Sequence, residues 1–141
     1  MRAIGIDPGT TRIGVAVSDE DGVLATPRTT LAYRGDAQAA SQIVQLASDE
    51  GASAIVIGLP LGLDGREGLS SRRARSLAKA IEAKTALAVV LWDERFTSAA
   101  AERSMASAGM SAKKRRGNVD RVAAAILLQS YLDAEAAKRA R

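Results

Sequence analysis

The sequence predicts an α/β protein in which a mixed five-stranded sheet carries helices on both faces. Two patterns predict this class: three short strand-like segments joined by tight turns, then two apolar strands that each follow a helix-like segment. The chain has 141 residues, of which 47% are hydrophobic, enough for one ordinary core. We therefore expect a single domain over residues 1–141.

The first three strands are expected to form an antiparallel meander. Residues 2–7 and 12–18 are largely apolar, and the turn-rich Pro8-Gly9-Thr10-Thr11 separates them. A third strand is expected over residues 23–31, after a second tight turn. Pro27 has no N–H to donate, so this strand should lie at a sheet edge or contain a bulge.

The next two strands are each reached through a helix. A helical pattern over residues 37–50, with Gly51 as its stop, leads into the continuous apolar run 54–59. A basic amphipathic helix over residues 70–84 leads into the apolar run 87–92. Such strands pair in parallel through right-handed crossovers. Three antiparallel strands followed by parallel strands, with helices on both faces, make the RNase H-like architecture.

The C-terminal part is expected to hold two helices, over residues 98–108 and 119–137, with a basic loop over 111–118 between them. Asp120 heads an apolar stripe of the last helix, which consists of Ala123, Ala124, Leu127, Leu128 and Tyr131. Because that stripe should pack on the sheet, Asp120 is predicted to face the sheet.

The composition excludes several kinds of chemistry. The chain has no Cys and no His, which excludes disulfides, thiolate zinc sites, Ser-His triads and HExxH metal sites. The lack of Cys fits a reducing compartment, and we expect a cytoplasmic protein. No signal peptide is recognised, and no apolar run approaches the ~18 residues of a membrane span, so no membrane is expected as a partner. Catalysis must therefore use carboxylates, hydroxyls, Lys, Arg or a metal held by oxygen ligands.

The charge is distributed unevenly along the chain. Residues 1–65 carry four basic and eight acidic side chains, whereas residues 66–141 carry sixteen and eight. A basic C-terminal half indicates a polyanionic partner, because each neutralised phosphate releases counterions. A solvated basic surface is the alternative interpretation.

Three elements end or begin with carboxylates that can converge at one edge of the sheet. Asp7 ends the first strand, Asp93 and Glu94 end the fifth, and Asp120 lies in the first turn of the last helix. Each also has a structural interpretation: a turn cap, an ion pair with Arg95, or a favourable interaction with the helix dipole.

Side-chain alternation places Asp93 and Glu94 on opposite faces, so one of them can join a shared site. We predict that Glu94 joins it, because the longer side chain reaches farther, while Asp93 caps the following turn. Asp7, Glu94 and Asp120 are therefore the predicted catalytic residues and metal ligands, with Asp93 as the alternative to Glu94. Oxygen ligands of this kind suit Mg²⁺ or Mn²⁺, and two such ions can cleave a phosphodiester.

A compact basic run comes directly before Asp120 in the sequence. We predict that it binds the nucleic-acid backbone together with Arg12, although a solvated loop would have the same composition. The run consists of Lys113, Lys114, Arg115 and Arg116.

Four segments carry recognisable motifs in order. They are residues 5–19 (GIDPGTTRIGVAVSD), 56–61 with Asp64-Gly65, 92–97 (WDERFT), and Lys113-Lys114 with Asp120 and residues 123–132. Together they closely resemble the YqgF/RuvX family over nearly the whole chain. Gly62 stands where Asn is expected and Phe96 where Leu is usual, and neither is a predicted metal ligand.

The resemblance implies an RNase H-like nuclease, related to bacterial Holliday-junction resolvases and implicated in maturing the 5′ end of 16S rRNA. It also implies that Asp7, the Asp93-Glu94 pair and Asp120 occupy the family's acidic positions. The expected function is a metal-dependent endonuclease acting on structured RNA such as precursor rRNA, or on branched DNA. A homodimer is left open.

Two other classes stay open at this point. The strand, Asp7 and the Gly-Thr-Thr turn also fit a phosphate-binding ATPase of the actin-like superfamily, although such proteins clamp nucleotide between two domains and this chain supplies one. A non-catalytic nucleic-acid-binding module is the second alternative. Nucleotide binding and cleavage assays distinguish all three.

Overall fold

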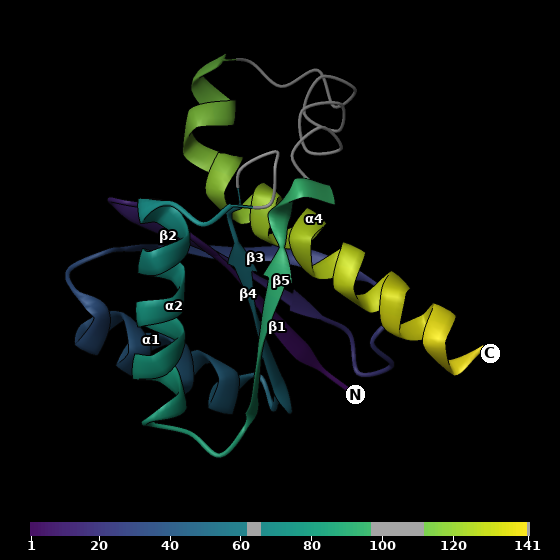
Figure 1. Ribbon diagram of the computed structural model, residues 1–141. Coiled ribbons are helices and arrows are strands. Elements are labelled where there is room, and N and C mark those ends of the chain that lie inside the picture. The colour runs from purple at the N-terminus through teal and green to yellow at the C-terminus, as the bar shows by residue number, and fades with distance from the viewer. Residues whose placement is uncertain (62–65, 97–111, 141) are drawn as a thin grey trace.

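Five strands form one mixed sheet in the computed structural model, which describes residues 1–61, 66–96 and 112–140 (Figure 1). The order across the sheet is β3-β2-β1-β4-β5. β1 pairs antiparallel with β2 and β2 with β3, whereas β1–β4 and β4–β5 are parallel. The predicted fold class is therefore confirmed. The strands are β1 (Ala3–Pro8), β2 (Arg12–Ser18), β3 (Ala25–Ala32), β4 (Ala54–Leu59) and β5 (Ala88–Asp93).

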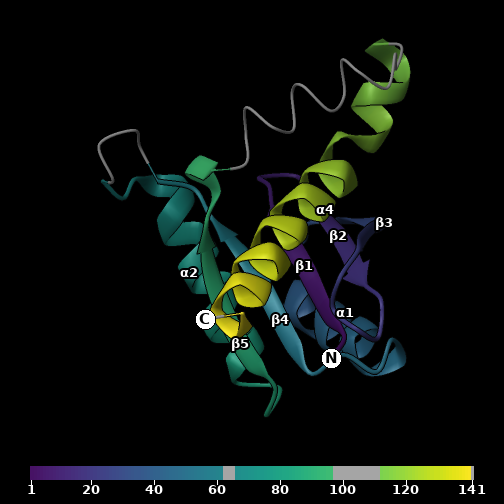
Figure 2. The same ribbon diagram turned by 90° about the vertical axis from the view of Figure 1, so that its right-hand side faces the viewer.

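Helices cover both faces of this sheet. α1 (Asp36–Asp49) and α2 (Leu69–Glu82) lie side by side on one face, and the long α4 (Ala112–Arg139) crosses the other (Figures 1 and 2). A short 3₁₀ helix, η1 (Glu94–Phe96), follows β5 directly. None of the helices in the described ranges is long and apolar enough to cross a membrane.

The two faces of the sheet carry side chains of different size. Large aliphatic residues of the strands pack against α1 and α2, among them Ile4, Ile6, Ile13, Ile55 and Ile57. Small residues dominate the opposite face, where Ala3, Ala16, Ala54 and Val56 pack against Ala124, Ala125, Leu128 and Leu132 of α4. Because these strand side chains are short, α4 can lie close to the sheet backbone.

The edge strand β3 contains a bulge. Val15 lies opposite Thr29 and Ala16 lies opposite Pro27, so Arg28 is the extra residue. The prediction that Pro27 marks an edge or a bulge is confirmed in both respects. The strand begins two residues later than predicted, because Val23 and Leu24 belong to the preceding turn, where their N–H groups donate to Oδ1 of Asp19 at 2.7 and 3.1 Å.

The start of the last helix differs from the prediction. The expected basic loop over 111–118 is wrong from Ala112 onward, where α4 begins. Ala, Lys and Arg are good helix formers, and one interior glycine such as Gly117 costs only about 1 kcal/mol. The predicted helix over residues 98–108 falls outside the described residues.

At α1, Gly51 adopts φ 65° and ends the helix as predicted.

Candidate active site

Two carboxylates meet at the edge of the sheet where β1 and β5 end. Asp7 is the penultimate residue of β1, and Glu94 follows β5 as the first residue of η1. Asp7 lies opposite Gly14 of β2, and it shares with Gly5 the face that packs against α4. The site is therefore built on the α4 side of the sheet.

Two strand glycines make room for the acidic residues. A Cβ on Gly14 would lie 1.8 Å from the backbone oxygen of Asp120, so α4 passes directly over β2 at that point. A Cβ on Gly58 would lie 2.1 Å from Oε1 of Glu94. These glycines were not among the residues predicted for the site. The signal was nonetheless present, because glycine inside an apolar strand often marks a close approach by another chain segment.

Asp7 is a half-buried carboxyl group surrounded by other acids. Burial, a hydrogen bond with the Glu94 side chain and the charges of Glu94 and Asp120 raise the pKa of Asp7 to about 9. Two carboxyl groups can hydrogen bond to each other only when one carries a proton. The raised pKa keeps a proton on Asp7 at neutral pH in the metal-free protein, and this proton makes the hydrogen bond with Glu94.

Asp120 lies at the same edge but is turned toward a cation. Nε of Arg12, in the first residue of β2, lies 3.3 Å from Oδ2 of Asp120. The Asp120 side chain is 24% exposed and that of Arg12 is 58% exposed. A predicted metal ligand is thus paired with a predicted phosphate-binding residue, and this ion pair was not predicted.

Asp93 lies apart from this group. It accepts a hydrogen bond of 2.9 Å from the N–H of Arg95 and a 2.6 Å contact from its guanidinium. These interactions with Arg95 hold the pKa of Asp93 below its usual value. The preceding residue, Trp92, points to the α4 side, where its Nε1 donates to Oγ of Ser130 at 3.1 Å. Strand alternation therefore separates Asp93 from Glu94.

The described residues contain no group of three acidic side chains arranged closely enough to hold one metal ion. Asp7 and Glu94 form a close pair, while Asp120 is held by Arg12. The donors nevertheless fit a hard divalent cation, because paired carboxylates offer oxygen ligands whose mutual repulsion a cation would remove. The backbone of Lys113, Lys114, Arg115 and Arg116 forms the beginning of α4, and their side chains lie outside the described part of the structure.

Comparison with known proteins gives consistent matches along nearly the whole chain. Residues 1–134 match the family model described as "RuvX: Holliday junction resolvase". A candidate pre-16S rRNA nuclease from Anaeromyxobacter dehalogenans is 45% identical over 138 residues, which is 96% of this chain and 99% of the relative. One from Acidiphilium cryptum is 45% identical over 132 residues, 94% of this chain and 84% of the relative.

Solved structures with a similar fold are much more distant in sequence. RuvC of T. thermophilus, in complex with a Holliday junction substrate, has a TM-score of 0.59 at 14% identity and covers 96% of both chains. The yeast mitochondrial Holliday junction resolvase has a TM-score of 0.58 at 10% identity, covering 95% of this chain and 78% of its own. These likenesses show the shared RNase H-like fold.

Proposed function

The chain belongs to the RuvX family, and from that membership we propose that it is an endonuclease that hydrolyses phosphodiester bonds in structured nucleic acid. The observation that carries the proposal is the Asp7–Glu94 pair, two partly buried acidic side chains that meet where β1 and β5 end. A carboxyl pair of this kind is costly for the fold and is typical of functional sites.

Precursor 16S rRNA is the substrate that the relatives favour. Relatives that are 45% identical over nearly the whole chain are named for that substrate, whereas the junction resolvases of known structure share only 10–14% of their residues with this chain. Branched DNA is the second substrate to test, because the family description names the Holliday junction.

Asp7, Glu94 and Asp120 would hold Mg²⁺ or Mn²⁺, and two such ions would activate a water and stabilise the leaving oxygen of the phosphodiester. The protein itself contributes position and charge. Gly58 leaves the space that keeps the Glu94 carboxylate beside Asp7, and Arg12 orients Asp120 through its 3.3 Å ion pair. The exposed part of the Arg12 guanidinium remains able to contact a phosphate.

Purified protein with Mg²⁺ or Mn²⁺ should cleave at least one of three matched substrates: precursor rRNA, linear DNA and a four-way junction. Asp7→Asn should lower single-turnover cleavage by about 10³-fold or more while folding is retained. The same substitution should raise the metal-free melting temperature by several degrees at neutral pH, because the Asp7 carboxyl must take up a proton when the parent protein folds, a cost that the neutral amide does not have.

Three results would contradict the proposal. They are full cleavage by Asp7→Asn, full cleavage in excess chelator, and tight ATP binding by calorimetry without cleavage of any of the three substrates. The last result would return the chain to the ATPase interpretation.

A further inference from the structure

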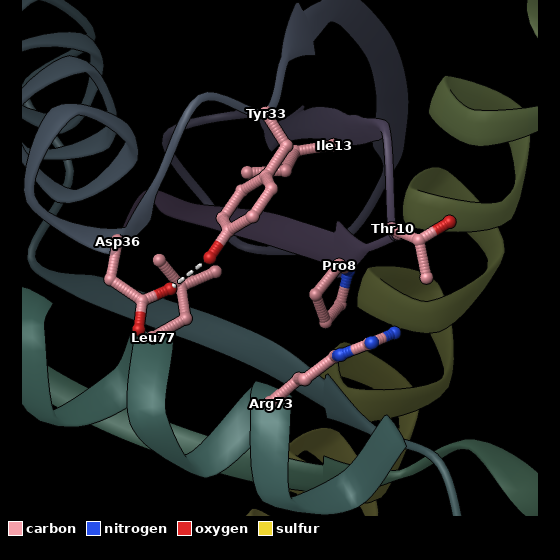
Figure 3. Close-up of a pocket in the computed structure, with 8 residues that line it drawn as sticks. Pro8, Thr10, Ile13, Tyr33, Asp36, Arg73 and Leu77 are labelled. Atoms are coloured by element: carbon pink, nitrogen blue, oxygen red, sulfur yellow. Dashed lines mark hydrogen bonds between the residues drawn. The ribbon is translucent and has the colours of Figure 1, made fainter. Parts of the chain in front are cut away.

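A second site lies next to the β1–β2 turn, on the opposite face of the sheet from the acidic residues. It is a cavity of about 170 Å³. Pro8, Ile13 and Leu77 give it an apolar lining, and Tyr33, Asp36 and Arg73 give it polar groups (Figure 3). None of these residues has a role in the function proposed above.

The polar groups of this pocket are held in fixed positions. The hydroxyl of Tyr33 donates to Oδ1 of Asp36 at 2.6 Å, and the hydroxyl of Ser76 donates to Oδ2 of the same carboxylate at 2.5 Å. Each Asp36 oxygen keeps a further lone pair that can accept another hydrogen bond.

Arg73 supplies the positive charge of the pocket. Its side chain extends from α2 toward the segment around Pro8 (Figure 3). Among the described acidic residues, none forms an ion pair with Arg73. The pocket thus combines an aromatic ring, a carboxylate acceptor and a guanidinium that pairs with no acid in the described part of the chain.

We propose that this pocket takes one unpaired nucleobase of the substrate strand while Arg73 contacts an adjoining phosphate. An apolar lining with an aromatic wall suits a flat ring, a fixed carboxylate suits an amino group on its edge, and guanidinium suits a phosphate. A cavity of about 150 Å³ accepts benzene. A volume of about 170 Å³ therefore has room for one ring system.

The place of the pocket connects it to the acidic residues, so this inference rests on the proposed function. Asp7 and Pro8 are consecutive, about 3.8 Å apart between their Cα atoms, and they face opposite sides of the sheet. A strand that crosses the sheet edge at the β1–β2 turn can place one phosphate beside Asp7 and a neighbouring base in the pocket. A paired and stacked base cannot enter, so the nucleotide beside the cut must be unpaired or flipped out.

The test uses mononucleotide binding, which does not depend on cleavage. The chain has only two tyrosines, so ¹³C-labelled tyrosine rings give two sets of NMR signals that Tyr131→Phe assigns. Tyr131 packs edge-on against Trp92 on the α4 side and serves as an internal control. Adenosine monophosphate at millimolar concentration should shift the Tyr33 signals and leave those of Tyr131 unchanged.

Two α2 variants test the role of the guanidinium. Arg73→Ala should raise the dissociation constant for the mononucleotide about tenfold, the loss expected for one charged hydrogen bond. Arg72→Ala removes the same charge from the neighbouring exposed position and should leave the dissociation constant within about twofold of the parent value.

Three results would overturn the base pocket: no shift at Tyr33, an equal shift with inorganic phosphate alone, or equal weakening by both α2 variants. Failure of the nuclease proposal looks different. If Tyr33 responds as expected while no nucleic acid is cleaved, the pocket stands and the proposed function fails. If cleavage depends on Asp7 but the Tyr33 signals do not shift, the proposed nuclease function is supported and the base pocket is wrong.

Discussion

At the scale of single residues, the site depends on where two neighbouring acids point. Asp93 and Glu94 are adjacent in the sequence, yet one is bound by Arg95 and the other lies beside Asp7. The cause is strand alternation at the end of β5, because Trp92 turns toward α4 and Asp93 turns away from it. Identical charges at consecutive positions therefore have different surroundings.

This difference gives a paired prediction. Glu94→Gln should abolish single-turnover cleavage, because the substitution removes a carboxylate charge beside Asp7. Asp93→Asn should lower the rate by less than about tenfold, since it weakens only an ion pair with Arg95 in which both side chains are partly exposed to solvent. Loss of cleavage in Asp93→Asn with an active Glu94→Gln would reverse the assignment.

At the scale of the elements, the position of α4 over the sheet depends on glycine. Gly14 allows the α4 backbone to contact β2, and Gly5 allows Leu128 to contact β1, where an added Cβ would lie 2.7 Å from Cβ of Leu128. Gln129 fixes α4 further, because its side chain accepts from the N–H of Ala25 at 2.9 Å and donates to the oxygen of Val23 at 2.8 Å. These contacts fix the distance between the strands and α4, the helix that carries Asp120.

Two glycine substitutions should separate stability from activity. Gly14→Ala should lower the free energy of unfolding by about 2 kcal/mol or more, because the new methyl meets the backbone of Asp120, which cannot rotate away. Gly58→Ala should cost about 1 kcal/mol or less, because it meets the flexible Glu94 side chain, but it should lower cleavage about 10²-fold by displacing that carboxylate. Urea denaturation and single-turnover kinetics measure the two effects, and equal unfolding costs would contradict the argument.

The basic start of α4 gives a prediction about binding. Replacing Lys113, Lys114, Arg115 and Arg116 with Ala should weaken binding about equally for all sequences and flatten its salt dependence. Each lost phosphate contact should reduce the slope of log K against log salt by about 0.9 on duplex or about 0.7 on single strands. Asp120→Asn is the matched control, since it should reduce cleavage while leaving binding intact or tighter. An unchanged slope, measured by fluorescence anisotropy, would identify the run as a solvated surface.

At the scale of the whole molecule, the mixed five-stranded sheet could be predicted because each strand carries its own local signal. Apolar runs marked β4 and β5, and Pro27 marked the bulged edge. The beginning of α4 could not be predicted, because Gly117-Asn118 is typical of a loop and only the completed helix outweighs that local preference. The Arg12–Asp120 pair could not be predicted either, because it requires knowing that α4 crosses β2 at Gly14.

The stability of the whole molecule should depend on pH through Asp19. Hydrogen bonds from the N–H groups of Leu24 and Val23 hold the pKa of Asp19 below its usual value of 3.8. A lowered folded-state pKa stabilises the protein above pH 3.8, and this contribution is lost as the pH falls through the lower folded value.

Asp19→Ala should therefore melt at a lower temperature than the parent protein at pH 7. The difference should shrink as the pH falls below about 3.8, because both chains then lack the charged acceptor. Asp21→Ala removes an equal charge from the same turn and controls for net charge. A difference in melting temperature that stays constant from pH 7 to about pH 2.5 would contradict the role given to Asp19.

The contact between α4 and the first strands also has a consequence for synthesis on the ribosome. Leu128 packs over Gly5, yet it is added roughly 6–25 s later at about 5–20 residues per second. Until α4 emerges, the side of β1 and β2 that carries Ala3 and Ala16 has no cover, and the nascent chain is exposed to aggregation. A stalled chain that ends before α4 also lacks Asp120. Such a nascent chain should therefore remain unable to cut the RNA of the ribosome that is making it.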